Sequence, residues 1–127
     1  MIQTQTLLKV SDNSGGKLAR CLKVLKKGTN PKYAKVGDLV VVSIQSIRSR
    51  NKITSKVKKG DVVNAVVVKT LTPLKRITGL MTHFTQNAVV ILTKQKKPLG
   101  TRVFGVVPKE LRFKKFTKIL TLAAGVV

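Results

Sequence analysis

The fold is indicated by residues 36–47, VGDLVVVSIQSI, and by a second stretch of the same design at residues 59–68, KGDVVNAVVV. In both, a Gly-Asp pair precedes a dense run of aliphatic residues. Glycine can adopt a positive φ there and aspartate can accept the next backbone N–H, so each pair predicts a turn before a strand. We therefore interpret Asp38 and Asp61 as turn residues rather than catalytic groups. A repeated turn and buried strand favour a small closed barrel, because closure removes exposed strand edges.

Short apolar runs rich in Val and Ile recur along the whole chain, separated by Gly, Pro, Asn or Asp. They occupy residues 7–10, 18–25, 39–47, 62–68, 88–92 and 103–107. This spacing predicts an all-β sandwich or barrel. The unbroken runs 39–42 and 66–68 could also belong to buried helices, but β-branching and the flanking glycines favour strands.

Only residues 108–120 have a helical pattern. A proline at their start can occupy a first helical turn, and Phe113, Phe116 and Leu120 form one stripe at helical spacing. Leu111 interrupts the pattern because it falls among the cations of the opposite side. We predict one or two short helices in this C-terminal segment.

The composition combines a core with an extreme positive charge. The 127 residues hold 26 Lys and Arg against four acids, a net charge of +22, and 43% are hydrophobic. We expect one domain over residues 1–127, and its self-repulsion requires a polyanion, most commonly a phosphate backbone. Aromatic residues make up only 4%, which argues against a module that stacks unpaired bases. The composition favours recognition of the backbone and shape of a folded nucleic acid.

The cations are concentrated in the predicted connections between strands. Such clusters are often merely solvated, but four acids are too few to balance them, so we expect them to contact phosphates. The predicted RNA-binding residues are Lys26, Lys27, Arg48, Arg50, Lys52, Lys56, Lys58, Lys59, Lys94, Lys96 and Lys97.

Catalytic and membrane functions find little support. His83 is the one histidine and Cys21 the one cysteine, so we expect no metal, no cofactor and a buried, inert thiol. An enzyme using His83 or Cys21 is kept as an alternative of another class. Residues 100–105, GTRVFG, resemble a glycine-rich loop only weakly, because they lack the ending and the following helix of a phosphate loop, and residues 12–16, DNSGG, are a turn-forming cluster with no stronger signal. No apolar run suggests a membrane span, no lipidation signal is present, and no targeting prefix is expected.

The order of motifs resembles that of a known family. The matching segments are residues 1–6 (MIQTQT), 10–15 (VSDNSG), 21–25 (CLKVL), 36–38 (VGD), 57–62 (VKKGDV), 65–68 (AVVV), 84–91 (FTQNAVVI), 98–105 (PLGTRVFG) and 109–112 (KELR). Over essentially its whole length the chain is similar to the fourteenth large-subunit ribosomal protein, a universal family.

This resemblance implies a five-stranded β-barrel with a short helical C-terminal part. It also implies a structural role in the large subunit, with large-subunit rRNA and the nineteenth large-subunit protein as partners and bridges to small-subunit rRNA. Within the family, the ribosome silencing factor docks at positions that correspond to Thr101, Arg102 and Lys118. Together with Arg112 and Lys115, these residues form the predicted intersubunit surface. A free, non-specific nucleic-acid-binding or chaperone barrel is the alternative.

Three departures from the family pattern carry further predictions. Thr78-Gly79 replaces the usual Asp-Gly or Asn-Gly of a hairpin, so a different turn is expected there. An insert at residues 49–55 is predicted to extend a β-ribbon towards RNA, and Ala124-Gly125 replaces a Pro-Glu near the end. With the excess of Lys, Thr and Ile, these departures favour an organelle-encoded, mitochondrial protein over a plastid or bacterial one.

Overall fold

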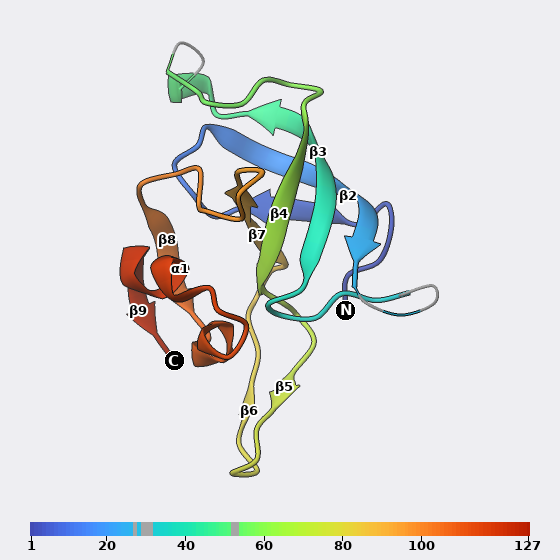
Figure 1. Cartoon of the computed structure of the whole chain (residues 1–127), viewed down its shortest axis with the longest axis vertical. Helices are drawn as coiled ribbons and strands as arrows, with labels where there is room; N and C mark the ends of the chain where they lie inside the picture. The colour runs from blue at the N-terminus through green and yellow to red at the C-terminus, as the bar shows by residue number, and fades with distance from the viewer. Residues whose placement is uncertain (27, 29–31, 52–53) are drawn as a thin grey trace.

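The fold is a closed barrel with a C-terminal layer and a projecting hairpin. A computed structural model describes residues 1–26, 28, 32–51 and 54–127. The barrel has the strand order β1-β2-β3-β4-β7, and its neighbours are antiparallel except β1 and β7, which pair in parallel to close it (Figure 1). Its strands are β1 (Leu7–Val10), β2 (Gly16–Leu25), β3 (Leu39–Ile47), β4 (Val62–Lys69) and β7 (Ala88–Leu92). The predicted all-β class and five-stranded closed barrel are confirmed.

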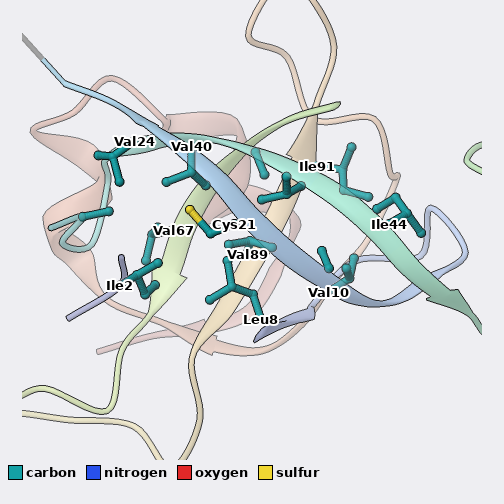
Figure 2. Close-up of a cluster of buried hydrophobic side chains, with 14 of the residues drawn as sticks. Ile2, Leu8, Val10, Cys21, Val24, Val40, Ile44, Val67, Val89 and Ile91 are labelled. Atoms are coloured by element: carbon teal, nitrogen blue, oxygen red, sulfur yellow. The ribbon is translucent and has the colours of Figure 1, made fainter. Parts of the chain in front are cut away.

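The barrel interior is filled by aliphatic side chains from alternating strand positions. Along β3, Val40, Val42 and Ile44 are buried, whereas their neighbours in sequence are partly exposed. Figure 2 shows Val40 and Ile44 converging with Cys21 and Val89 in the lumen, and Val42 belongs to the same cluster. A slip of one residue in register would turn the whole apolar set outwards, so this alternation fixes the pairing of β3 with its neighbours.

Two barrel strands are covered on both faces, which explains their unbroken apolar runs. In β4, Val67 belongs to the luminal cluster, while Val66 and Val68 belong to a second cluster outside the barrel. In β7, Val89 faces the lumen and Val90 the outer cluster. These runs are therefore strands, as predicted, because a second layer buries the face that would otherwise contact water.

That second layer is the C-terminal segment. It contains β8 (Val103–Val107), the 3₁₀ helix η2 (Lys109–Arg112), α1 (Thr117–Leu122) and β9 (Ala123–Val126), with β8 and β9 paired in parallel beside the barrel (Figure 1). The two short predicted helices are present, and Phe116 and Leu120 of the predicted apolar stripe pack against the outer cluster, but the stripe is wrong at Phe113. Leu111 is completely buried, whereas the side chain of Phe113 is 82% exposed. The 3₁₀ turn changes the helical phase, so Leu111 faces the barrel.

A two-stranded hairpin projects away from the barrel. Strands β5 (Leu74–Lys75) and β6 (Met81–Thr82) form its arms (Figure 1). Gly79 takes φ +82° at the tip and donates its N–H to the Arg76 carbonyl oxygen at 3.0 Å. The expectation of a turn without a positive φ at Thr78 is confirmed, because only Gly79 adopts the left-handed conformation.

The β-ribbon was predicted at the wrong place. Within the insert 49–55, residues Ser49–Asn51 form the 3₁₀ helix η1, and residues 52 and 53 lie outside the described part of the chain. The ribbon is instead the β5–β6 hairpin, where Gly79 supplies the positive φ of the reversal. None of the helices in the described part of the chain has the length and apolar character to cross a bilayer.

Both Gly-Asp turns form before their strands as predicted, but each aspartate accepts an earlier backbone N–H rather than the next one. Gly37 and Gly60 take φ +82° and +90°. Asp38 Oδ2 accepts the N–H of Lys35 at 2.9 Å, and Asp61 Oδ2 accepts the N–H of Lys58 at 2.8 Å. Each carboxylate thus bonds the backbone of the residue three positions earlier and closes the turn immediately before β3 or β4 begins.

Candidate nucleic-acid interface

All four acids of this protein make contacts within the fold. Asp38 and Asp61 close turns, and Glu110 pairs with Arg76, whose Nε lies 2.6 Å from Oε1. Asp12 is buried, where Oδ2 accepts the N–H of Ile91 at 2.9 Å. Burial raises the pKa of Asp12, although hydrogen bonds from Ser14 and Ile91 and the charge of Arg48 oppose that rise.

Few cations therefore have a carboxylate partner. Among the described residues, the ion pairs involve Lys26, Lys114 and Arg76 only; Lys26 and Lys114 lie 3.7 and 3.8 Å from Asp38. These two lysines are about half exposed, so the pairs contribute little stability. The remaining described cations present an uncompensated positive field to the surroundings of the barrel.

The structure brings three of the predicted residues together around Asp38. Lys26, Lys96 and Lys115 line a pocket of about 660 Å³ between the end of β2, the turn after β7 and the segment that joins η2 to α1. Two of these lysines adopt the left-handed backbone conformation, Lys96 at φ +60° and Lys115 at φ +64°. Residues predicted separately for rRNA and for the intersubunit surface thus share one site.

A second site is built by the turn at residues 12–16 and the segment that leads into β8. Asn13 Oδ1 accepts the backbone N–H groups of Thr101 and Arg102 at 2.8 and 3.1 Å, and its Nδ2 donates to Thr101 Oγ1 at 2.7 Å. Lys56 Nζ donates to the Leu99 carbonyl oxygen at 3.0 Å. Asn13 is thus a positioning residue for the predicted intersubunit residues, and the sequence offered only its turn-forming character as a signal.

Most other predicted residues are exposed and line neither of these two sites. Those exposed to solvent outside both groups are Arg50, Lys58, Lys59, Lys94, Lys97, Arg112 and Lys118. Lys27 and Lys52 lie outside the residues that the structure describes. The structure therefore presents exposed cationic side chains from many of its connections.

One cationic site was missed by the sequence prediction. Lys69 is only 8% exposed at the end of β4 and lines a pocket with Lys9 and Arg48. Arg48 is partly buried here, and its guanidinium lies 4.8 Å from the centre of the Phe104 ring. The signal available in the sequence was a lysine that directly follows the apolar run 65–68, at the end of a buried strand where apolar residues are normal.

The side chains considered for catalysis are dispersed. His83 is exposed near the base of the hairpin, and Cys21 lies in the barrel lumen, where burial raises the pKa of its thiol. The predicted buried thiol is confirmed, and a raised pKa disfavours the reactive thiolate. In residues 1–26, 28, 32–51 and 54–127, no three His, Cys, Asp or Glu side chains gather as a metal site would require.

A small closed barrel with uncompensated cations on its connections defines a class, the basic β-barrel proteins suited to a polyanionic partner. The whole chain, residues 1–127, matches the family described as ribosomal protein L14p/L23e. The chain belongs to this family, and it is a structural component of the large ribosomal subunit.

Proposed function

We propose that this protein binds large-subunit rRNA through its basic connections and helps to form the surface that faces the small subunit. The observation that carries the proposal is the commitment of all four acids to internal contacts, which leaves most of the described cations without a carboxylate partner. Phosphates of folded RNA supply the missing negative charge without demanding base-stacking side chains. The shortage of acids is then an adaptation to permanent packing in RNA.

Salt dependence tests this mechanism directly. Purified full-length protein is titrated with a large-subunit rRNA transcript and, separately, with a generic RNA duplex at several salt concentrations. We expect the log–log slope for rRNA to change by about −0.7 to −0.9 for each phosphate neutralised. An rRNA affinity that is indifferent to salt would exclude phosphate contacts as the mechanism.

The same titration separates the proposal from a free nucleic-acid chaperone. A chaperone binds the generic duplex as tightly as the rRNA, and the endogenous protein then sediments away from ribosomal particles. A large-subunit protein co-sediments with that subunit through a high-salt gradient. Repeating the gradient with purified mitochondria tests the organellar assignment, which rests on the abundance of Lys and the scarcity of acids.

The intersubunit surface is proposed to include Thr101, Arg102, Arg112, Lys115 and Lys118. Arg102 is exposed next to the segment that Asn13 holds, which gives a partner a defined backbone to recognise. The nineteenth large-subunit protein, small-subunit rRNA and a silencing factor are the proposed partners here. We expect Arg102→Ala and Lys118→Ala to weaken capture of the silencing factor, whereas Lys94→Ala leaves it unchanged; equal capture by all three variants would exclude this surface.

A further inference from the structure

A cationic pocket lies between the barrel and the C-terminal layer. It is open to solvent, has a volume of about 360 Å³ and is lined by residues that are far apart in sequence. They are Lys9, Val10 and Ser11 of the β1 end, Arg48 after β3, Lys69 of β4, Gln86 before β7, and Phe104 and Gly105 of β8. The pocket therefore exists only when the barrel has closed and β8 has packed against it.

Lys69 is the buried anchor of this pocket. Its ammonium donates to the Phe104 carbonyl oxygen at 3.2 Å and lies 5.9 Å from the centre of the Phe84 ring. An ammonium has three donors, and one carbonyl oxygen does not replace the water that a buried charge has lost. A hydrogen-bonding anion in the pocket would compensate the remaining desolvation.

Arg48 is held in a fixed position on another side of the pocket. Its Nη2 donates to the Val10 carbonyl oxygen at 3.0 Å while the guanidinium stacks on Phe104. A guanidinium fixed in this way retains other N–H donors, which suit the oxygens of a phosphate. Lys9 is exposed at the rim and adds a third positive charge.

No acid is among the described residues that line the pocket. Asp12 is the carboxylate whose charge acts on Arg48, but its oxygens are occupied by Ser14 and Ile91. Consistent with this, burial and then the charge of Lys9 lower the pKa of Lys69. The pocket thus has an excess of positive charge that the folded chain does not neutralise.

We propose that this pocket binds one internucleotide phosphate of RNA, with Lys69 as the buried anchor and Arg48 and Lys9 completing the cationic wall. The inference rests on the proposed role in rRNA binding and assigns a specific contact to it. The cavity is about twelve times the ~30 Å³ share of one water molecule, so it admits a phosphate with part of its ribose. Ser11 and Gln86 add polar groups on the wall.

The absence of a side chain at Gly105 leaves space for the Lys69 ammonium. It takes φ +74°, and a Cβ at this position would lie 2.8 Å from Lys69 Nζ. Gly105→Ala therefore displaces the ammonium without changing the net charge. It complements Lys69→Met, which removes the charge and keeps a side chain of similar length.

The first experiment measures anion binding by the full-length protein. Melting temperatures are compared in sodium phosphate and sodium chloride at equal ionic strength, with Lys23→Met as a matched control because Lys23 is exposed on β2. Phosphate should raise the melting temperature of the wild type and Lys23→Met, since a ligand of the folded state stabilises it. Lys69→Met should lose most of this rise, and a rise equal to that of the control would overturn the proposal.

Loss of folding does not obscure this result. Lys69→Met replaces a buried charge by an apolar side chain, so in chloride it should melt at least as high as the wild type. In NMR spectra of the wild type, phosphate should shift the amide signals of Phe104 and Gly105 in a saturable way. Shifts spread evenly over exposed lysines, with none at these two residues, would contradict a defined pocket.

The second experiment identifies the source of the phosphate. With large-subunit rRNA, we expect Lys69→Met and Gly105→Ala each to lose at least tenfold more affinity than Lys23→Met. If the wild type does not bind rRNA, the proposed function itself fails. If it binds and both pocket variants match the control, only the pocket assignment fails; a phosphate-dependent melting rise would then identify a free phosphate as the ligand.

Discussion

Asn13 and Thr101 are joined by a reciprocal pair of hydrogen bonds. The side-chain amide of Asn13 accepts the Thr101 N–H at 2.8 Å and donates to Thr101 Oγ1 at 2.7 Å. The two residues lie 88 positions apart, so this contact ties the turn after β1 to the segment before β8. It gives the exposed residues at this edge a fixed backbone from which to meet a partner.

Removal of the Asn13 amide should loosen that segment. We expect Asn13→Ala to lower the free energy of unfolding by about 1–2 kcal/mol, because two backbone N–H groups lose their acceptor. Hydrogen exchange should become faster at the amides of Thr101 and Arg102. As a control, Asn87→Ala removes one acceptor from the Leu71 N–H and should leave Thr101 and Arg102 protected. Unchanged protection in Asn13→Ala would contradict the positioning role.

Gly100 should not tolerate a side chain. A Cβ there would lie 2.6 Å from Asn13 Oδ1 and 3.2 Å from Asp12 Cβ, so Gly100→Ala must displace the same turn. We expect a loss of about 1–3 kcal/mol in urea denaturation. At Gly125 the nearest contact would be 3.6 Å, so Gly125→Ala should change stability by less than about 1 kcal/mol. A smaller loss at Gly100 than at Gly125 would contradict the close approach.

Arg76 and Glu110 connect the hairpin to η2, and their contribution should depend on pH. Although burial opposes ionisation of Glu110, hydrogen bonding and the charge of Arg76 outweigh it and lower its pKa from 4.5. The pair therefore stabilises the protein above pH 4.5, and this stability is lost as the pH falls through the folded-state pKa. Glu110→Gln should cost about 1 kcal/mol at neutral pH and almost nothing at low pH.

Asp12 contributes a pH dependence of the opposite sign. Its raised pKa favours the folded state below its ordinary value of 3.8, and this advantage disappears as the pH rises through the folded-state pKa. The wild type and Glu110→Gln are therefore compared at each pH by urea denaturation, so that the contribution of Asp12 cancels. A difference that is independent of pH would show that the ion pair does not stabilise the protein.

The two apolar residues of the η2 region should differ sharply on truncation. Leu111 is fully buried against the barrel, so Leu111→Ala should cost about 2–5 kcal/mol. Phe113 is 82% exposed, and Phe113→Ala should change the free energy of unfolding by less than about 0.5 kcal/mol. Thermal or urea denaturation of both variants measures these losses. A larger loss for Phe113→Ala than for Leu111→Ala would support the apolar stripe predicted from the sequence.

Replacing Lys96 by glycine should stabilise the folded protein. It holds φ +60° in the turn after β7, where a Cβ is unfavourable and glycine is not. We expect Lys96→Gly to raise the free energy of unfolding by about 0.5–1 kcal/mol relative to Lys94→Gly, which removes the same charge. Equal urea midpoints for the two variants would show that the turn carries no backbone strain.

Much of the barrel was predictable from local sequence. Residues 7–10, 39–47 and 88–92 are strands with the predicted bounds, and the other predicted runs extend by two residues or less. Both Gly-Asp turns form because φ > 0 and a side-chain acceptor are local properties of those residues. The predicted strand 103–107 also forms, but outside the barrel, because its partner is the C-terminal β9.

The candidate site was less predictable, since its geometry depends on distant partners. A sequence shows that Lys58 and Lys94 lie in connections, and exposure there follows directly. It does not show that Lys26 pairs with Asp38, or that Lys69 is buried, because both depend on which strands become neighbours. The prediction of the β-ribbon at residues 49–55 was wrong for a related reason, because the length of an insert does not by itself show that it forms a hairpin.

The sequence by itself determined an aliphatic barrel with far too many cations for its own acids, and hence a polyanionic partner. The alternation of apolar residues and the conformational preferences of turn residues are local, and composition is a property of the sequence, so all three can be recognised without the structure. Only the tertiary structure decided where Asn13 meets Thr101, and that Lys9, Arg48 and Lys69 enclose one pocket. Such contacts join residues far apart in sequence, and the closure of the barrel and the packing of β8 against it bring them together.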